Sequence, residues 1–140
     1  MPFAEIAEQA NAISAYYGGD STNVPSEFEL AIWAGDYFDD GSEELSYPGY
    51  ARQTITNDLT GWTVDTDLGT STATVTLPDA TGEATTEDGD RWVLFNKDTG
   101  VASVWEFLDA PISIDDAGSI DPIDVVVYNA NQTLIDAAES

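Results

Sequence analysis

Carboxylates are the side chains of this sequence on which any chemistry would have to rely. The 140 residues include 27 Asp and Glu against 3 Lys and Arg, with no histidine and no cysteine. The chain therefore lacks imidazole bases, thiolate nucleophiles and the common protein ligands of transition metals. Catalysis would be left to carboxylates, hydroxyls or a hard cation.

Two acidic clusters offer several oxygens within one or two loops. Ca²⁺ takes about six to eight such oxygens, yet neither cluster has the central glycine and closing glutamate of a calcium-binding EF-hand loop. With 27 carboxylates spread over the chain, such proximity is expected, so we interpret both clusters as solvated loop acids and assign no metal and no cofactor. The clusters are Asp88 with Asp90, and Asp115, Asp116, Asp121 and Asp124.

Adjacent acids are the other candidate for chemistry, because glycoside hydrolysis uses two carboxylates. Glu43 with Glu44, and Asp39 with Asp40, are such pairs. Neither pair has an apolar setting that would raise one pKa above the other. The sequence also lacks a glycine-rich phosphate loop and a Gly-x-Ser-x-Gly elbow. We therefore expect a protein that is not an enzyme.

The formal net charge of −24 bears on partners and source. Nucleic acid and anionic membranes are excluded as partners, since only Arg52, Arg91 and Lys97 could neutralise phosphate. No apolar run reaches the roughly 20 residues of a membrane span, and the start lacks the positive region of a secretory signal. Scattered acid with one lysine predicts a halophilic source, because about 1 M salt shortens the Debye length to roughly 3 Å. An ordinary acidic protein is the alternative.

The elements that would position these groups follow from apolar spacing. Between residues 3 and 17, apolar side chains recur at the spacing of one helical face and predict a short N-terminal helix, which Gly18 and Gly19 end. From residue 28 the period changes to two, and turn residues separate the segments. Strands are expected at residues 28–33, 51–56, 72–77, 91–96, 101–107, 112–114 and 123–128, with a weak last one at 133–135.

These elements predict one all-β domain over residues 1–140. Residues 1–19 contain the helix and its end, and residues 20–140 form an antiparallel β-sandwich or jelly roll of about seven to eight strands. The aromatic residues Trp33, Trp92 and Trp105 lie inside strand patterns, which predicts packing in the core or at an interface. A stacking platform for sugars is the alternative interpretation of the aromatics.

Two groups of apolar residues are candidates for contact with another protein. One is the helix face, with Phe3, Ile6 and Ile13. The other consists of loop aromatics that no predicted strand would bury, which are Tyr37, Phe38 and Tyr47.

The order of several short motifs resembles a known family. Asn11-Ala12-Ile13, the strand over residues 28–34, Gly49-Tyr50-Ala51-Arg52-Gln53 and the hairpin sequence of residues 91–100 follow one another. In this order the chain is similar, over most of its length, to small tailed-phage virion proteins labelled tail fibre protein-like. It differs in being far more acidic and in having Asn96 where an aspartate is common.

The resemblance implies a structural role in a virus particle. The implied function is capsid decoration or attachment to the capsid, with a tail fibre or adaptor component as the alternative; the implied partners are the major capsid protein or tail proteins. The implied location is the virion, assembled in the host cytoplasm, and the composition points to a tailed virus of a halophilic host. A homo-oligomer, with a trimer favoured, is expected from the symmetry of attachment points. A stand-alone glycan- or calcium-binding module is the competing function.

Overall fold

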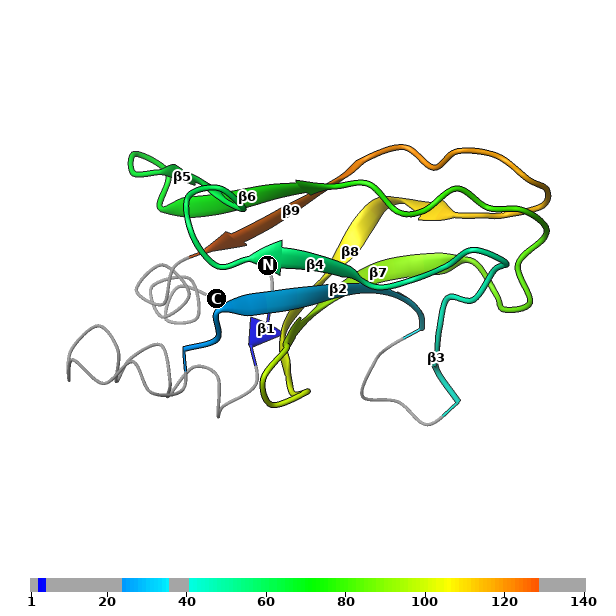
Figure 1. Cartoon of the computed structure of the whole chain (residues 1–140), viewed down its shortest axis with the longest axis horizontal. Coiled ribbons are helices and arrows are strands. Elements are labelled where there is room, and N and C mark those ends of the chain that lie inside the picture. Colours follow the sequence, from blue (N-terminus) through cyan, green and yellow to red (C-terminus); the bar gives the residue numbers. More distant parts are fainter. Residues whose placement is uncertain (1–2, 5–23, 36–40, 129–140) are drawn as a thin grey trace.

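The computed structural model of the chain describes residues 3–4, 24–35 and 41–128. These residues form two antiparallel β-sheets that lie one over the other (Figure 1). The six-stranded sheet has the order β1-β8-β7-β2-β3, with β4 also paired to β2, and the three-stranded sheet has the order β5-β6-β9. The strands are β1 Phe3–Ala4, β2 Glu27–Ala34, β3 Glu43–Glu44, β4 Gln53–Thr56, β5 Thr63–Asp65, β6 Thr70–Val75, β7 Gly89–Asn96, β8 Ala102–Ile112 and β9 Ile123–Tyr128.

The all-β antiparallel prediction is confirmed, and β7 is the central element. It pairs with β2 on one side and with β8 on the other. Residues 92–96 of this strand are all buried, since neighbours cover both edges and side chains pack on both faces. A near-continuous apolar run, Trp-Val-Leu-Phe, is what a strand covered on both faces requires.

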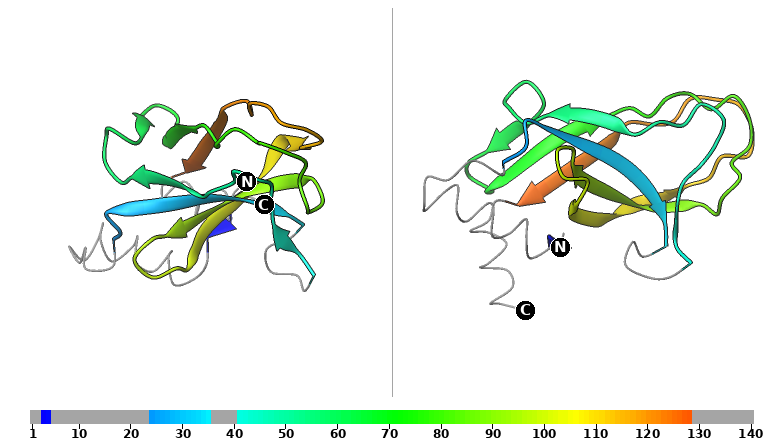
Figure 2. Two further views of the ribbon diagram at one scale, coloured as in Figure 1. Left: turned by 45° about the vertical axis from the view of Figure 1, so that its right-hand side comes forward. Right: turned by 60° about the horizontal axis from the view of Figure 1, so that its bottom comes forward.

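The main core lies between the two sheets. Alternate residues of β2 and β7, such as Leu30 and Trp92, meet Val75 of β6 and Val125 of β9 there. A second, smaller cluster lies on the opposite face of the six-stranded sheet, around Val93. Figure 2 shows the two layers from two further directions.

The Gly-Tyr-Ala-Arg segment, residues 49–52, supports the edge of β2 in the gap between the residues that pair with β4 and those that pair with β3. Gly49 adopts φ +100°, a conformation that favours glycine, and a Cβ there would lie 2.6 Å from the Asp79 carbonyl oxygen. The Tyr50 hydroxyl accepts a hydrogen bond from the Ile32 amide at 3.1 Å and donates one to Glu44 Oε2 at 2.6 Å. This motif therefore has a structural role.

The hairpin between β7 and β8 is closed by Asn96. Its buried side-chain oxygen accepts hydrogen bonds from the amides of Asp98 at 3.0 Å and Thr99 at 3.3 Å. An aspartate would accept the same two bonds, so the amide replaces it here without a change of turn.

The structure corrects two predictions about elements. Phe3 and Ala4 form β1, paired with Trp105 and Val104 of β8, so the predicted helix is wrong for these two residues. The edge of β8 supplies hydrogen-bond partners that helix periodicity does not reveal. The separate strand predicted at residues 112–114 is also wrong, because β8 continues to Ile112. The rest of the predicted helix and the strand at residues 133–135 lie outside the described residues.

Candidate functional site

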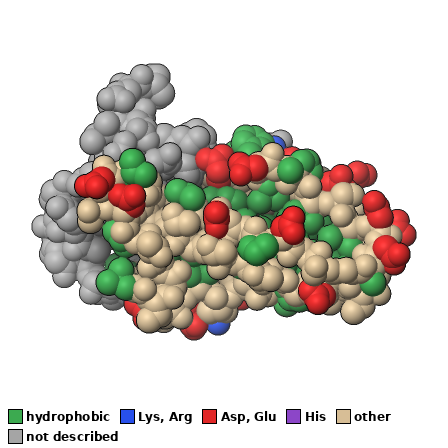
Figure 3. Space-filling view, turned by 90° about the horizontal axis from the view of Figure 1, so that it is seen from above, with side chains coloured by type: hydrophobic (Ala, Val, Ile, Leu, Met, Phe, Trp, Pro, Cys, Tyr) green, Lys and Arg blue, Asp and Glu red, His purple; other side chains and the backbone are tan. Residues whose placement is uncertain are grey.

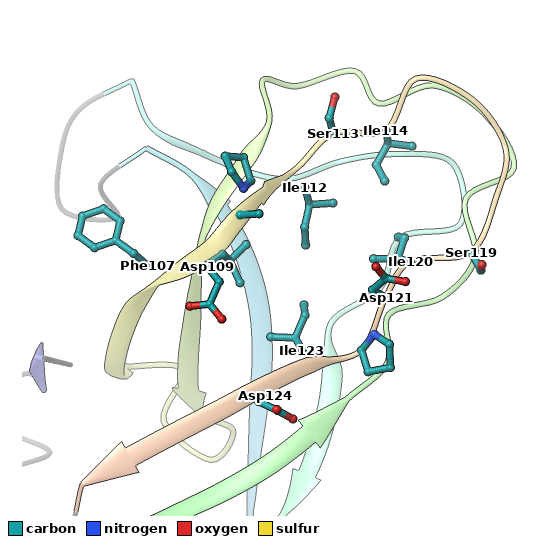
Figure 4. Close-up of a pocket in the computed structure, with 14 residues that line it drawn as sticks. Phe107, Asp109, Ile112, Ser113, Ile114, Ser119, Ile120, Asp121, Ile123 and Asp124 are labelled. Atoms are coloured by element: carbon teal, nitrogen blue, oxygen red, sulfur yellow. The ribbon is translucent and has the colours of Figure 1, made fainter.

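A groove opens on one side of the sandwich, between the last part of β8 and the start of β9. It has a volume of about 530 Å³ and is lined by residues 107–114 and 119–124 (Figure 4). One wall is the last part of β8, and the other is the segment of residues 119–122 with the first two residues of β9, Ile123 and Asp124. We call it the open-side groove.

A bulge in β8 creates one wall of the groove. Arg91 of β7 is opposite Phe107 and Gly89 is opposite Ile112, so residues 108–111 of β8 face Asp90 alone. Extra residues on one strand bend it away from its partner. Pro111, which has no N–H to donate, lies in this bulge. The strand rises here from the lower layer toward the upper one (Figure 1).

Apolar side chains line the interior of the groove. Leu108, Ile112, Ile114 and Ile120 are partly exposed and pack against the main core, and Ile123 of β9 is buried beside them. In Figure 4 the side chains of Ile112, Ile120 and Ile123 point toward one another across the gap. The core is therefore open to solvent at this side of the sandwich.

The charged residues of the groove are all acidic. Asp109, Asp121 and Asp124 are exposed at its margins, and no Lys or Arg is among its described lining residues. Asp124 Oδ1 accepts a hydrogen bond from the Thr74 hydroxyl at 2.8 Å. Figure 3 shows that Asp and Glu side chains also spread over the face seen from above, with hydrophobic side chains between them.

The carboxylates that the sequence singled out do not form a metal centre in the described part of the chain. Within residues 3–4, 24–35 and 41–128, no group of three or more acidic side chains is placed to hold a metal ion. Asp90 instead accepts a hydrogen bond from the Gly35 amide at 3.1 Å, and Asp116 accepts one from the Ala117 amide at 2.8 Å. Asp90 lies in β7 and Asp124 in β9, so each cluster extends from a loop into a strand.

Glu44, which forms a candidate pair with Glu43, makes hydrogen bonds that stabilise the fold. Its oxygens accept hydrogen bonds from Arg52 Nε at 3.0 Å and Nη2 at 2.9 Å, besides the one from Tyr50. Burial and the bond to Glu44 raise the pKa of the Tyr50 hydroxyl, and the same carboxylate raises the pKa of Arg52. The network stabilises the edge of β2. Asp39 and Asp40 lie outside the described residues.

The predicted interface residues are placed as follows. Phe3 is in β1, on the edge of β8. The prediction that no element buries Tyr47 is wrong: its side chain is 4% exposed, within the main core, and its hydroxyl donates a hydrogen bond to the Pro78 carbonyl at 2.7 Å. The remaining four, Ile6, Ile13, Tyr37 and Phe38, lie outside the described residues.

One exposed aromatic cluster was not singled out from the sequence. Phe107 is 55% exposed, and its ring meets Trp105 edge to face at 5.2 Å between centroids. The Arg91 guanidinium lies over both rings, 5.0 Å from the centroid of Trp105 and 4.6 Å from that of Phe107. The alternation Trp-x-Phe at the end of a strand is the signal that would have indicated it.

Comparison with known proteins assigns neither a family nor a relative. No protein-family model matches the chain, and no curated protein matches it. Within the described residues, no helix is long and apolar enough to cross a membrane.

Proposed function

We propose that this chain is a non-enzymatic structural protein of a tailed-virus particle, attached to the capsid through contacts with the major capsid protein. The observation that carries the proposal is the open-side groove. Among the described strands none pairs with the outer edge of β9, and such an edge beside partly exposed apolar side chains suits attachment to a neighbouring protein. The resemblance in the order of the motifs supplies the setting, a virus particle.

The motif that contributes to the resemblance fits a structural role. Gly49, Tyr50 and Arg52 serve the turn and the edge of β2, so they belong to the framework of the fold. Particle components act by burying surface against their neighbours, and a rigid framework lowers the cost of ordering that surface on assembly.

Quantitative mass spectrometry of purified particles tests the proposal. We expect a stoichiometric copy number relative to the major capsid protein, set by the symmetry of the attachment site. Particles from which tails have been detached should retain the chain. Loss of the chain with the tails would assign it to the tail fibre or adaptor instead, and its absence from purified particles would contradict the proposal.

A glycan-binding module is the second candidate, and the exposed ring of Phe107 is the observation that favours it. Aromatic rings beside polar groups are used for stacking against ligands. Here Trp105 and Arg91 hold the ring of Phe107 at the surface. Saturable binding of the purified chain to a glycan array, abolished in Phe107→Ala and retained in a control such as Leu59→Ala, would support this function over the first.

A further inference from the structure

β9 begins at the open-side groove, which its first two residues, Ile123 and Asp124, line. In the described part of the chain, β9 pairs with β6 along its whole length and no strand pairs with its other edge. Alternate residues of an antiparallel edge strand direct N–H and C=O groups away from the sheet. Such a row is a template for the addition of another strand.

The groove has room for the side chains of an added strand. The upper sheet has three strands and the lower sheet six, and the open-side groove lies between the end of β8 and the start of β9 (Figures 1 and 4). A strand paired along the six residues of β9 would span about 20 Å at roughly 3.3 Å per residue. Beside Ile123 and Asp124, the residues of β9 that line the groove, the inward-facing side chains of the added strand would cover Leu108, Ile112 and Ile120.

Charge distinguishes among the candidate proteins for supplying this strand. Asp109, Asp121 and Asp124 border the groove, so a bound strand is favoured if it brings cations. The chain itself has only three side-chain cations, and each has an acidic neighbour: Arg52 lies 2.9 Å from Glu44, Arg91 3.6 Å from Asp90 and Lys97 3.5 Å from Glu27. Residues 5–23 and 129–140 contain no Lys or Arg. A second copy or a terminus of this chain would therefore place further carboxylates beside the aspartates of the groove without adding a free cation.

We infer that the open-side groove binds an extended segment of another particle protein, which adds to the three-stranded sheet as a strand beside β9. This inference rests on the proposed function. In the bound segment, apolar residues alternate with polar ones, and at least one Lys or Arg faces the aspartates of the groove. Main-chain hydrogen bonds to β9 supply affinity, and the apolar positions and the cation supply specificity.

Site-specific photocrosslinking in assembled particles tests the inference, and the absence of native cysteine makes it direct. Ser119→Cys places a thiol in the lining of the groove, and Val126→Cys places one on β9. Leu59→Cys, in the exposed loop between β4 and β5, is the control outside the groove. Each variant is labelled with a benzophenone maleimide, incorporated into particles and irradiated, and the crosslinked peptides are identified by mass spectrometry.

The inference predicts that the thiol positions in the groove and on β9, Ser119 and Val126, crosslink to one segment of another particle protein, which contains Lys or Arg, and that Leu59→Cys does not. Crosslinks to a second copy or to the termini of this chain would overturn it. The absence of crosslinks in particles that contain the labelled chain would also overturn the inference. That result would not contradict the proposed function, because the chain would still be a particle component. Failure of all three variants and of the unmodified chain to incorporate would contradict the proposed function itself.

A pair of charge variants tests the electrostatic part. Asp109→Asn with Asp121→Asn, in the Ser119→Cys background, removes two charges from the groove. Glu83→Gln with Glu87→Gln removes two exposed charges elsewhere, so the net charge is matched. We expect the crosslink yield to fall several-fold in the first pair only. Equal yields in the two pairs would overturn the requirement for a cation in the bound segment.

Discussion

At the scale of single residues, the Tyr50 hydroxyl connects three segments of the fold. It accepts from the Ile32 amide and donates to Glu44, which in turn accepts from Arg52. Burial and the bond to Glu44 raise the pKa of Tyr50 above its ordinary value near 10. The proton is therefore held more tightly in the folded state than in the unfolded state.

This raised pKa predicts a loss of stability at alkaline pH. The folded state binds more protons than the unfolded state above about pH 10, so the free energy of unfolding falls there by at most about 1.4 kcal/mol per pH unit for one tyrosine. Tyr50→Phe should weaken this alkaline decrease while lowering stability at neutral pH by about 1 kcal/mol through the lost hydrogen bonds. Urea unfolding from pH 7 to 11 measures both effects. An unchanged alkaline slope would show that Tyr50 does not carry the effect.

Gly89 offers a second test at this scale, on packing between β7 and its neighbours. A Cβ at this position would collide with the Ile32 side chain. We expect Gly89→Ala to lower the free energy of unfolding by about 1 to 3 kcal/mol. Gly118→Ala is the matched control, since nothing lies within 4 Å of a Cβ there. Equal stability of the two variants, measured by thermal or urea unfolding, would contradict the packing described here.

At the scale of elements, β9 and β8 differ in how far local sequence determines them. The alternation of β9, bounded by Pro122, predicted its ends at residues 123–128 as found. The sequence predicts one strand at residues 101–107 and another at 112–114, whereas β8 continues to Ile112 through a bulge. Bulges depend on the register of the neighbouring strand, which alternation does not encode.

The site was harder to predict than the fold for the same reason. The open-side groove exists because β8 bends away while β9 ends the upper sheet, and both facts depend on pairing between distant segments. Tyr47 shows the same limit for a buried residue. It lies in no predicted strand, so the sequence predicts an exposed side chain, yet the side chain is buried and its hydroxyl donates a hydrogen bond to the Pro78 carbonyl.

The edge of β9 that pairs with no described strand predicts an alternating pattern of amide exchange. In the isolated chain, amides of β9 that point toward β6 should exchange slowly, and the intervening amides should exchange fast, because no described strand pairs with that edge. Hydrogen exchange followed by NMR resolves this alternation. Uniformly slow exchange along β9 in the monomeric chain would mean that its outer edge is already paired.

At the scale of the whole molecule, the net charge of −24 dominates the electrostatic contribution to stability. With 27 acidic and 3 basic side chains, repulsion in the compact state exceeds that in the expanded chain. We expect the melting temperature to rise with sodium chloride and to level off near about 1 M, where the Debye length is roughly 3 Å. Potassium chloride should act equally, since screening does not depend on the cation. A melting temperature independent of salt would remove the physical basis for a halophilic source.

A cryo-electron microscopy map of purified particles would show whether this protein attaches to a virus particle through the open-side groove, as we propose. We predict two stacked sheets at symmetry-related sites on the capsid, with an extra strand of density beside β9 that is continuous with a neighbouring protein. Particles that contain the chain but show an empty groove, with contact through another face, would contradict attachment through the groove.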